Sequence, residues 1–433
     1  MFSDYNVAMK WGRHSAKLLI AILYSCAGAG AAEDDGYQAG YDDIPVFGGP
    51  DGVSEDLRSA DEIKATRFKF DPENHLLAPY FDAKRELEDD HGVAFGVRYY
   101  LLAQHASASA GDKTAAGGVF RFQGTWTLFE GKGKNRGFLE WRLENRHALW
   151  GRQAPSELAA NIGAAALNTG FAYTPDFDTD LAVFNWTQLF NQGRSGIAAG
   201  RLAFPSYLDS MPFQTFTRGF INRSFFINPT LGTSGIGALG MVAKGFVSEQ
   251  FWLGAHIYDG NAVNGSFDLD TFREKEWLTA VEVGWTPQYE HRRNKLLQFT
   301  YWHKDGRSLA GVPAGSGWAA SGVWQLSDTV LPFVRLGHSD GGAGVQAESA
   351  ISAGVELTNK FNDALSVGVG WAQPSEKTHG QGAGDEWVLE TSYKFQLSDN
   401  FSITPDVQLL LNPAKNPDKS RVWIMGLRML FFY

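Results

Sequence analysis

From residue 91 onward, apolar and polar positions alternate in segments about ten residues long, the usual length of a membrane-crossing β-strand. The segment 139–146 shows the pattern most clearly. There, Leu139, Trp141 and Leu143 alternate with Glu140, Arg142, Glu144 and Arg146. The segments 386–397 and 401–411 follow the same rule. Successive side chains of a strand point to opposite faces, so each segment is predicted to be a strand with one apolar face and one polar face.

About sixteen strands of this kind are expected. They lie near residues 92–104, 117–130, 136–149, 179–192, 194–204, 234–247, 249–260, 275–287, 294–305, 316–326, 328–338, 345–359, 363–373, 384–397, 400–412 and 420–433. Links after even-numbered strands are mostly short, whereas links after odd-numbered strands are mostly longer, and two are very long, at about 150–178 and 205–233. A soluble β-sandwich also alternates but has no reason to sort its links in this way. The pattern therefore predicts an all-β fold, a transmembrane antiparallel β-barrel over residues 91–433.

Aromatic residues support a membrane location for this barrel. Trp and Tyr recur near the ends of the apolar faces, where they would form girdles at the lipid boundaries: Tyr99, Trp126, Trp277, Trp285, Trp371, Trp387 and Tyr433. The chain also ends in an apolar strand with an aromatic carboxyl terminus, which resembles the assembly signal of outer-membrane barrels. We therefore expect contacts with outer-membrane lipid and lipopolysaccharide, and with the barrel assembly machinery through Tyr433.

The residues before the barrel divide into two parts. Residues 1–32 have the basic start, short apolar run and small-residue cleavage sites of a secretory signal peptide, which predicts export to the outer membrane of a Gram-negative bacterium. Residues 33–90 are acidic and lack alternation, and they are predicted to be an N-terminal periplasmic segment. Within it, 48–52 is expected to be a loop and 80–90 one short helix, with Pro79 near its start and Gly92 beyond its end.

Composition agrees with an exported β-rich protein. The 433 residues include 49 Gly and are 14% aromatic, which suits an ordered sheet protein. Cys26, the one cysteine, falls within the predicted signal peptide, so no disulfide is expected in the exported chain. The formal charge is −10, and removal of residues 1–32 leaves 35 basic and 47 acidic groups, or −12. An acidic chain is a poor binder of nucleic acid.

The sequence contains no pattern that indicates catalysis. It has no HExxH metal motif and no GxSxG nucleophile motif. The GxGxxG match at 235–240 falls inside a predicted strand, whereas a dinucleotide site needs a strand before it and a helix after it. We therefore predict no catalytic residues, no cofactor, no metal and no enzymatic activity.

A barrel of about sixteen strands is too wide for its own side chains to fill, so a water-filled channel is expected. Water in the channel would avoid the cost of burying unpaired charges, several kcal/mol for each ion. The residues predicted to line the pore are Glu140, Arg142, Glu144, Arg146, Arg98, Arg201, Arg335 and Glu282, with Glu356 and Glu390 extending the lining. The long links 150–178 and 205–233 are expected to fold inward and narrow the channel. The first would contain a short helix, and the second carries Arg218, Asn222 and Arg223.

The C-terminal third carries a recognisable set of motifs. Residues 390–405 read ETSYKFQLSDNFSITP, and an Asn-Pro loop then leads to a last strand with Gly-Leu-Arg at its centre. The residues that carry the pattern are Tyr393, Phe395, Gln396, Leu397, Ile403, Thr404, Pro405, Asp406, Gln408, Asn412, Pro413, Asn416, Pro417, Gly426, Leu427 and Arg428. This region resembles the carbohydrate-selective porin family of the OprB type, and the charged strand 139–147 resembles the third strand of that family. The chain departs from the family at 79–82, where a Trp-Gly-Gly-Arg-like helix start is usual.

The resemblance implies a 16-stranded outer-membrane barrel that lets small carbohydrates, monosaccharides such as glucose, diffuse passively through a water-filled pore. Arg and Glu side chains would donate and accept hydrogen bonds at sugar hydroxyls. A general or anion-type porin stays open as an alternative, as does an outer-membrane barrel enzyme. The sequence also leaves open the preferred sugar and whether the chain forms a homo-oligomer.

Overall fold

The structure is a computed structural model that describes residues 48–61, 66–68, 77–131, 134–175, 177–264 and 269–433. The predicted signal peptide, residues 1–32, lies outside the described residues, as do residues 33–47 of the predicted N-terminal segment. Within the described ranges, no helix is both long enough and apolar enough to cross a membrane.

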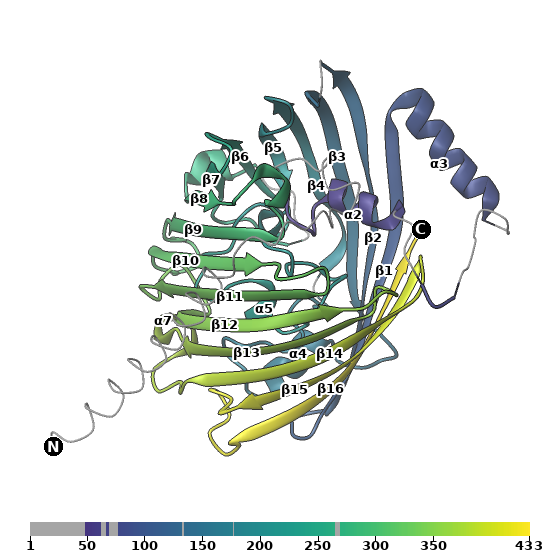
Figure 1. The fold of residues 1–433 in the computed structure, drawn as a ribbon. Helices are drawn as coiled ribbons and strands as arrows, with labels where there is room; N and C mark the ends of the chain where they lie inside the picture. The colour runs from purple at the N-terminus through teal and green to yellow at the C-terminus, as the bar shows by residue number, and fades with distance from the viewer. Residues whose placement is uncertain (1–47, 62–65, 69–76, 132–133, 176, 265–268) are drawn as a thin grey trace. The chain divides into compact units, whose positions relative to one another are not determined.

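The described residues contain sixteen strands and a few short helices (Figure 1). The strands are β1 (Val93–Ala106), β2 (Thr114–Glu130), β3 (Arg136–Ala148), β4 (Phe177–Phe190), β5 (Ser195–Leu202), β6 (Ala238–Phe246), β7 (Phe251–Asp259), β8 (Trp277–Trp285), β9 (Lys295–Lys304), β10 (Gly315–Trp324), β11 (Val330–Ser339), β12 (Ala347–Thr358), β13 (Ala364–Pro374), β14 (Glu386–Ser398), β15 (Phe401–Leu411) and β16 (Arg421–Phe432). The helices are α2 (Val53–Asp61), α3 (Ala78–His91), α4 (Pro155–Asn161), η3 (Phe204–Ser206), α5 (Arg223–Phe226), α6 (Thr271–Glu274), η4 (Tyr289–His291) and α7 (Glu376–His379).

Each strand pairs with the strands before and after it, and β1 pairs with β16 to close the barrel. All these pairs are antiparallel, and in the closing pair Arg98 lies opposite Phe432. Tyr433 takes part in the closure. Its N–H donates to the carbonyl of Val97 at 2.8 Å, and its carbonyl accepts the N–H of Val97 at 2.6 Å. A closed ladder leaves no strand edge unpaired, as a membrane-spanning sheet requires. The predicted all-β, sixteen-stranded antiparallel barrel is confirmed.

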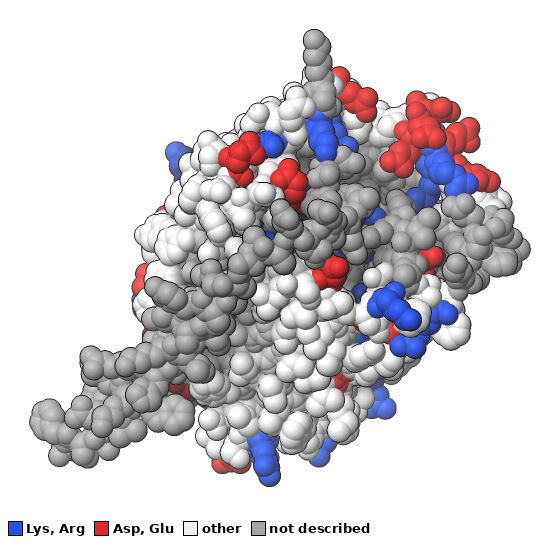
Figure 2. Space-filling model, in the orientation of Figure 1, with Lys and Arg blue, Asp and Glu red and all other residues white. Residues whose placement is uncertain are grey.

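The predicted alternation divides each strand between the two faces of the barrel. Along β8, for example, Thr279, Val281 and Val283 are exposed on the outer face, while Ala280 and Glu282 are buried on the inner face. Figure 2 shows the result as a mostly uncharged flank of the barrel, with acidic side chains gathered over α3. The outer face is thus suited to lipid, and polar groups are concentrated inside.

Most of the predicted girdle aromatics lie at strand ends. Trp371 and Trp387 meet at a centroid distance of 6.4 Å where β13 ends and β14 begins. At the opposite end of the barrel, Trp285 stacks on Trp324 at 5.8 Å. Tyr99 is an exception, since it lies in the middle of β1 and its hydroxyl is 2.9 Å from Nε2 of His147. Its pairing with this histidine, and not a boundary position, explains that site.

The links between strands also follow the predicted division. The short links after even-numbered strands include 191–194 and 399–400, and the longest links, 149–176 and 203–237, follow β3 and β5. The predicted short helix of the first long link is α4. Strand boundaries differ from the prediction by a few residues; β6, for example, begins at Ala238, so the first residues of the GxGxxG match precede the strand.

The residues ahead of the barrel form two described helices, not one. The predicted helix is α3, which ends at Gly92 in the left-handed conformation that glycine adopts readily. It lies against the outer face of β1, where Tyr80 packs edge-on against Phe95. The second helix, α2, was not predicted, because its apolar pattern consists only of Val53 and Leu57.

Candidate functional site

Four arginines on neighbouring strands form one side of the barrel interior. We call Arg98 on β1, Arg121 on β2, and Arg142 and Arg146 on β3 the arginine wall. Arg98 lies directly opposite Arg121, and Arg121 lies directly opposite Glu144. Strand alternation sends all these side chains inward, so the wall concentrates positive charge on a small inner surface.

Residues 48–59, which we call the inner segment, lie against this wall and supply its carboxylates. Asp51 forms a bidentate pair with Arg121, with distances of 2.7 and 3.1 Å from the guanidinium nitrogens to Oδ1 and Oδ2. Asp56 accepts from the Gln123 amide at 3.1 Å, and its carboxylate is 3.4 Å from Arg98 and 3.5 Å from Arg142. Bidentate Arg–carboxylate pairs are among the stronger and more directional polar contacts in proteins.

Other contacts fix the inner segment in place. Ser54 donates to Glu140 at 2.8 Å, and the N–H of Gly49 donates to the carbonyl of Ser206. Val53 and Leu57 of α2 pack against Val183 and Ala203 in a small apolar cluster. Figure 1 shows α2 within the ring of strands. Asp56 of the helix therefore meets the arginine wall, and the adjacent Val53 and Leu57 pack on apolar residues.

The five predicted lining residues on β1 and β3 come together here, but their surroundings differ from the prediction. Arg98, Arg142 and Glu144 are all at most 1% exposed, and Glu140 and Arg146 are each 6% exposed. Glu144 binds Arg121 and Arg146 at 2.6 and 2.7 Å. Protein partners thus compensate most of these charges, because the inner segment and the long links cover them.

The other predicted lining residues occupy two further places. Arg335 on β11 pairs with Asp209 of the second long link at 2.6 Å. Glu282 on β8 accepts the backbone N–H of the same Asp209 at 2.7 Å and contacts Lys244 at 2.7 Å. Arg201 stands apart and pairs with Asp180. The structure therefore brings Arg335 and Glu282 together around one residue of an inward link.

A third group of inner carboxylates binds the backbone of the inward links. Glu386 on β14 accepts hydrogen bonds from the N–H groups of Ala165, Ala166 and Leu167 at 2.7 to 3.0 Å, and from Ala414 at 2.9 Å. Glu390 accepts from Ile221 and Asn222. On β12, Glu356 binds Arg218 at 2.6 Å. We call these three residues, Glu356, Glu386 and Glu390, the glutamate wall.

The glutamate wall positions a half-buried pair on the two inward links. Arg223 of α5 places its guanidinium 5.4 Å from the ring centre of Phe171. The backbone N–H of Arg223 donates to Asn168 at 3.0 Å, and this bond holds the two links together. Burial lowers the pKa of Arg223 to about 10, so the group stays charged at pH 7. Its Nε has no hydrogen-bond partner among the described residues.

More polar atoms without partners lie nearby on β1, β15, β16 and the first long link. Within the described parts of the chain, the buried atoms without a hydrogen bond include Gln104 Oε1, Thr169 Oγ1, Tyr173 OH, Thr404 Oγ1 and Arg428 Nε. Gln104 and Gln408 both donate to the carbonyl of Thr169, which places these strands against the link. Buried polar groups normally find a partner in protein, water or ligand. The set contains donors and acceptors, which is what hydroxyl-bearing molecules require.

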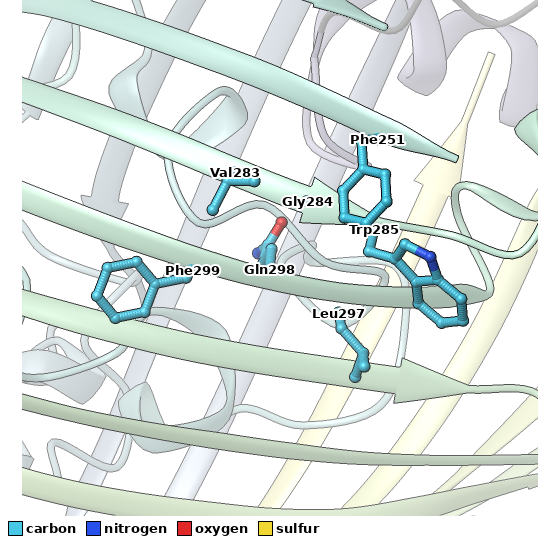
Figure 3. Close-up of a pocket in the computed structure, with 7 residues that line it drawn as sticks. All are labelled: Phe251, Val283, Gly284, Trp285, Leu297, Gln298 and Phe299. Atoms are coloured by element: carbon cyan, nitrogen blue, oxygen red, sulfur yellow. The ribbon is translucent and has the colours of Figure 1, made fainter. Parts of the chain in front are cut away.

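An apolar depression lies on the outer face of the barrel (Figure 3). Phe251, Val283, Trp285, Leu297 and Phe299 line it, together with Gly284 and Gln298. The five apolar side chains belong to the lipid-facing side of β7, β8 and β9, so the depression is separate from the interior site.

Sequence analysis missed the inner segment. Asp51 and Asp56 stand in an acidic stretch without strand alternation, and nothing in their spacing indicates arginine partners on strands far along the chain. The one available signal was the short helical pair Val53 and Leu57 next to the predicted loop 48–52. The roles of Glu386 and Glu390 were also missed, because their partners are backbone N–H groups that any residue carries.

Comparisons with known proteins agree with this architecture. Residues 315–433 match a sequence model of the family described as carbohydrate-selective porin, OprB family. Porin AaxA of Chlamydia felis (strain Fe/C-56) is 20% identical over 412 residues, which cover 87% of this chain and 90% of that porin. Porin AaxA of Chlamydia abortus (strain DSM 27085 / S26/3) is 22% identical over 259 residues, 58% of this chain and 57% of that porin.

Among solved structures, the high-pH structure of Pseudomonas putida OprB is similar with a TM-score of 0.65 at 12% identity, covering 82% of this chain and 97% of that chain. At this identity the likeness shows the fold. The family match begins at β10 and contains all the motif residues between 390 and 433 on which the resemblance was predicted. Family and fold are those of a pore and not of an enzyme. The predicted resemblance is confirmed: residues 315–433 match the carbohydrate-selective porin family of the OprB type, and the described chain has the fold of an outer-membrane β-barrel porin.

Proposed function

We propose that the chain lets small neutral carbohydrates, monosaccharides such as glucose, diffuse passively across the outer membrane of a Gram-negative bacterium. The family match to carbohydrate-selective porins over residues 315–433 is the observation that carries this proposal. In the same proposal, residues 1–32 are removed on export and Tyr433 is recognised by the barrel assembly machinery. The outer face then contacts lipid and lipopolysaccharide.

The solute contacts are assigned to the pair formed by Arg223 and Phe171. A guanidinium donates charge-assisted hydrogen bonds to hydroxyl groups, and an aromatic ring stacks on the apolar face of a sugar ring. The unpartnered polar atoms of Gln104, Thr404 and Arg428 extend the same chemistry along the wall. The predicted lining residues Arg98, Arg142, Arg335, Glu140, Glu144, Arg146 and Glu282 act in this proposal mainly by holding the inner segment and the links, since they are buried and paired, while Arg201 pairs with Asp180 on the neighbouring strand.

Single-channel recording with the full exported chain in planar bilayers tests the proposal. Glucose should reduce the ion current in a concentration-dependent way, and R223A should raise the half-blocking concentration roughly tenfold through the loss of a charge-assisted hydrogen bond. Liposomes that contain the porin should swell faster in glucose than in a trisaccharide of equal osmolarity.

The chain offers a matched control in a second Arg–Phe pair, Arg67 over Phe361 at 5.3 Å, beside a short turn of the barrel. F361A should leave glucose block unchanged, whereas F171A should weaken it. Unchanged current in glucose, maltose and xylose, together with block by an organic anion, would replace the sugar assignment with an anion-type porin.

A further inference from the structure

The arginine wall has a net positive charge unless the inner segment is present. Its four arginines face two strand carboxylates, Glu140 and Glu144, and the other two carboxylates come from Asp51 and Asp56. The segment therefore supplies half of the negative charge at this place. Uncompensated like charges at such close range strongly favour binding of an anion.

The contacts of Asp51 resemble those of a bound ligand. Its carboxylate lies 2.7 and 3.1 Å from Arg121, and Arg142 donates to its main-chain carbonyl at 2.8 Å. Arg121 is oriented from the other side by Glu144 at 2.6 Å, and its guanidinium lies over the ring of Phe216 at 4.8 Å. The guanidinium is thus fixed by groups of the barrel and its links, and its remaining edge is directed at the carboxylate.

The position of Asp51 in the inner segment is not fixed by a helix or a strand. Asp51 lies in a loop between Gly49 and Gly52, outside α2 and outside the strands. Glu55 and Arg58 of the same helix pair with each other at 2.7 Å, so within the described part of the chain the ion-pair partner of Glu55 is Arg58 and not an arginine of the wall. The carboxylates of positions 51 and 56 are therefore the part of the segment that matches the wall.

We propose that Arg98, Arg121 and Arg142 form a binding site for carboxylate-bearing solutes, and that Asp51 and Asp56 occupy it as an intramolecular ligand. The inner segment then excludes anionic solutes from this side of the channel and leaves passage to neutral ones. The proposal rests on the pore assignment of the proposed function but not on the identity of the sugar. It predicts that removal of the two carboxylates increases the permeability of the pore to anions.

Ion selectivity of the full exported chain in planar bilayers tests the proposal. D51N/D56N should raise the ratio of chloride to potassium permeability, taken from reversal potentials in a KCl gradient, by about threefold or more. Glucuronate should block this variant at a roughly tenfold lower concentration than it blocks the wild type, since a charge-assisted pair becomes available. E55Q removes one charge from the same helix and should change neither quantity.

Equal selectivity in D51N/D56N and wild type, or an equal shift in E55Q, would overturn the proposal. If the double variant lacks the heat-modifiable folded band on gels, D51N alone gives the same test, because Asp56 then still compensates part of the wall. Glucose-driven swelling of the same vesicles is measured in parallel. Loss of swelling in the wild type would contradict the sugar pore without affecting the selectivity result, so the two failures are distinguishable.

Discussion

The arginine wall and the glutamate wall satisfy buried charge in different ways. On the arginine wall, side-chain charge meets side-chain charge, and Asp51 and Asp56 reach the wall from a segment ahead of the barrel. On the glutamate wall, Glu386 and Glu390 accept the backbone N–H groups of links that belong to the barrel itself. The difference shows that buried charges in one barrel interior can have different structural roles. One set neutralises a segment, and the other shapes the loops.

The largest effect is expected at the centre of the arginine wall. R121A would leave Asp51 and Glu144 without their closest cation, and breaking a buried pair from one side costs about 3–5 kcal/mol. The free energy of unfolding, measured by urea titration in lipid vesicles, should fall by that amount. R85A removes an exposed pair with Asp82 on α3 and serves as the control. A loss below about 1 kcal/mol in R121A would show that the wall is screened by water.

A smaller effect is expected on the glutamate wall. E386A removes the acceptor of four backbone N–H groups, and each unsatisfied buried donor costs about 1–3 kcal/mol before the links relax. Because links relax more easily than strands, we expect a net loss of about 2–3 kcal/mol together with a larger and noisier single-channel current. E376A on the exposed helix α7 should leave both unchanged. Unaltered current in E386A would contradict the anchoring of the links.

Acid should affect a third charge, which lies outside both walls. Arg67, which follows the inner segment in the chain, pairs with Asp363 in the turn between β12 and β13 at 2.6 Å. Burial alone would raise the pKa of Asp363, but hydrogen bonds from Arg67, Asn359 and the Gln396 N–H outweigh burial and lower it. A carboxyl group with a lowered pKa adds stability above its ordinary value of 3.8 and loses that contribution as the pH falls through the folded value.

D363N should therefore have a lower Tm than the wild type at pH 7, and the gap should close well below pH 3.8. Thermal unfolding in detergent at several pH values measures the gap. A gap that is constant across this range would mean that Asp363 acts through packing and not through its charge.

The smallest effect is expected at a pair that belongs to neither wall. Arg194 and Glu249 meet at 2.5 Å on two short turns, where Glu249 is 73% exposed. Exposed pairs contribute about 0–1 kcal/mol, so R194A should leave the urea midpoint nearly unchanged. A loss as large as that of R121A would remove the distinction between buried and exposed pairs on which the comparison depends.

The sequence predicted the barrel because the barrel is a local property of each strand. The alternation of Leu139 with Glu140 is visible in the sequence alone, and the structure places these residues on opposite faces. The division of the links into short and long ones is equally visible along the chain, because each link lies directly between two predicted strands. Short-range patterns of this kind need no knowledge of distant partners.

The partners of the inner charges could not be predicted in the same way. Arg121 meets Asp51 and Asp56 across sequence separations of 70 and 65 residues, and neither spacing carries a periodic signal. Glu386 meets Ala165, Ala166 and Leu167, whose side chains offer no polar cue at all. Inward-facing charges were therefore expected to meet water, whereas the structure compensates many of them with protein.

The place of the inner segment inside the barrel is the central claim, and thiol cross-linking tests it most directly. The hydroxyl oxygen of Ser54 lies 2.8 Å from the carboxylate of Glu140, which faces inward, while the preceding residue, Leu139, faces lipid. In a C26S background, S54C/E140C should cross-link with a short bifunctional thiol reagent in the folded porin, and S54C/L139C should not. Equal cross-linking of both pairs, or of neither, would contradict the account.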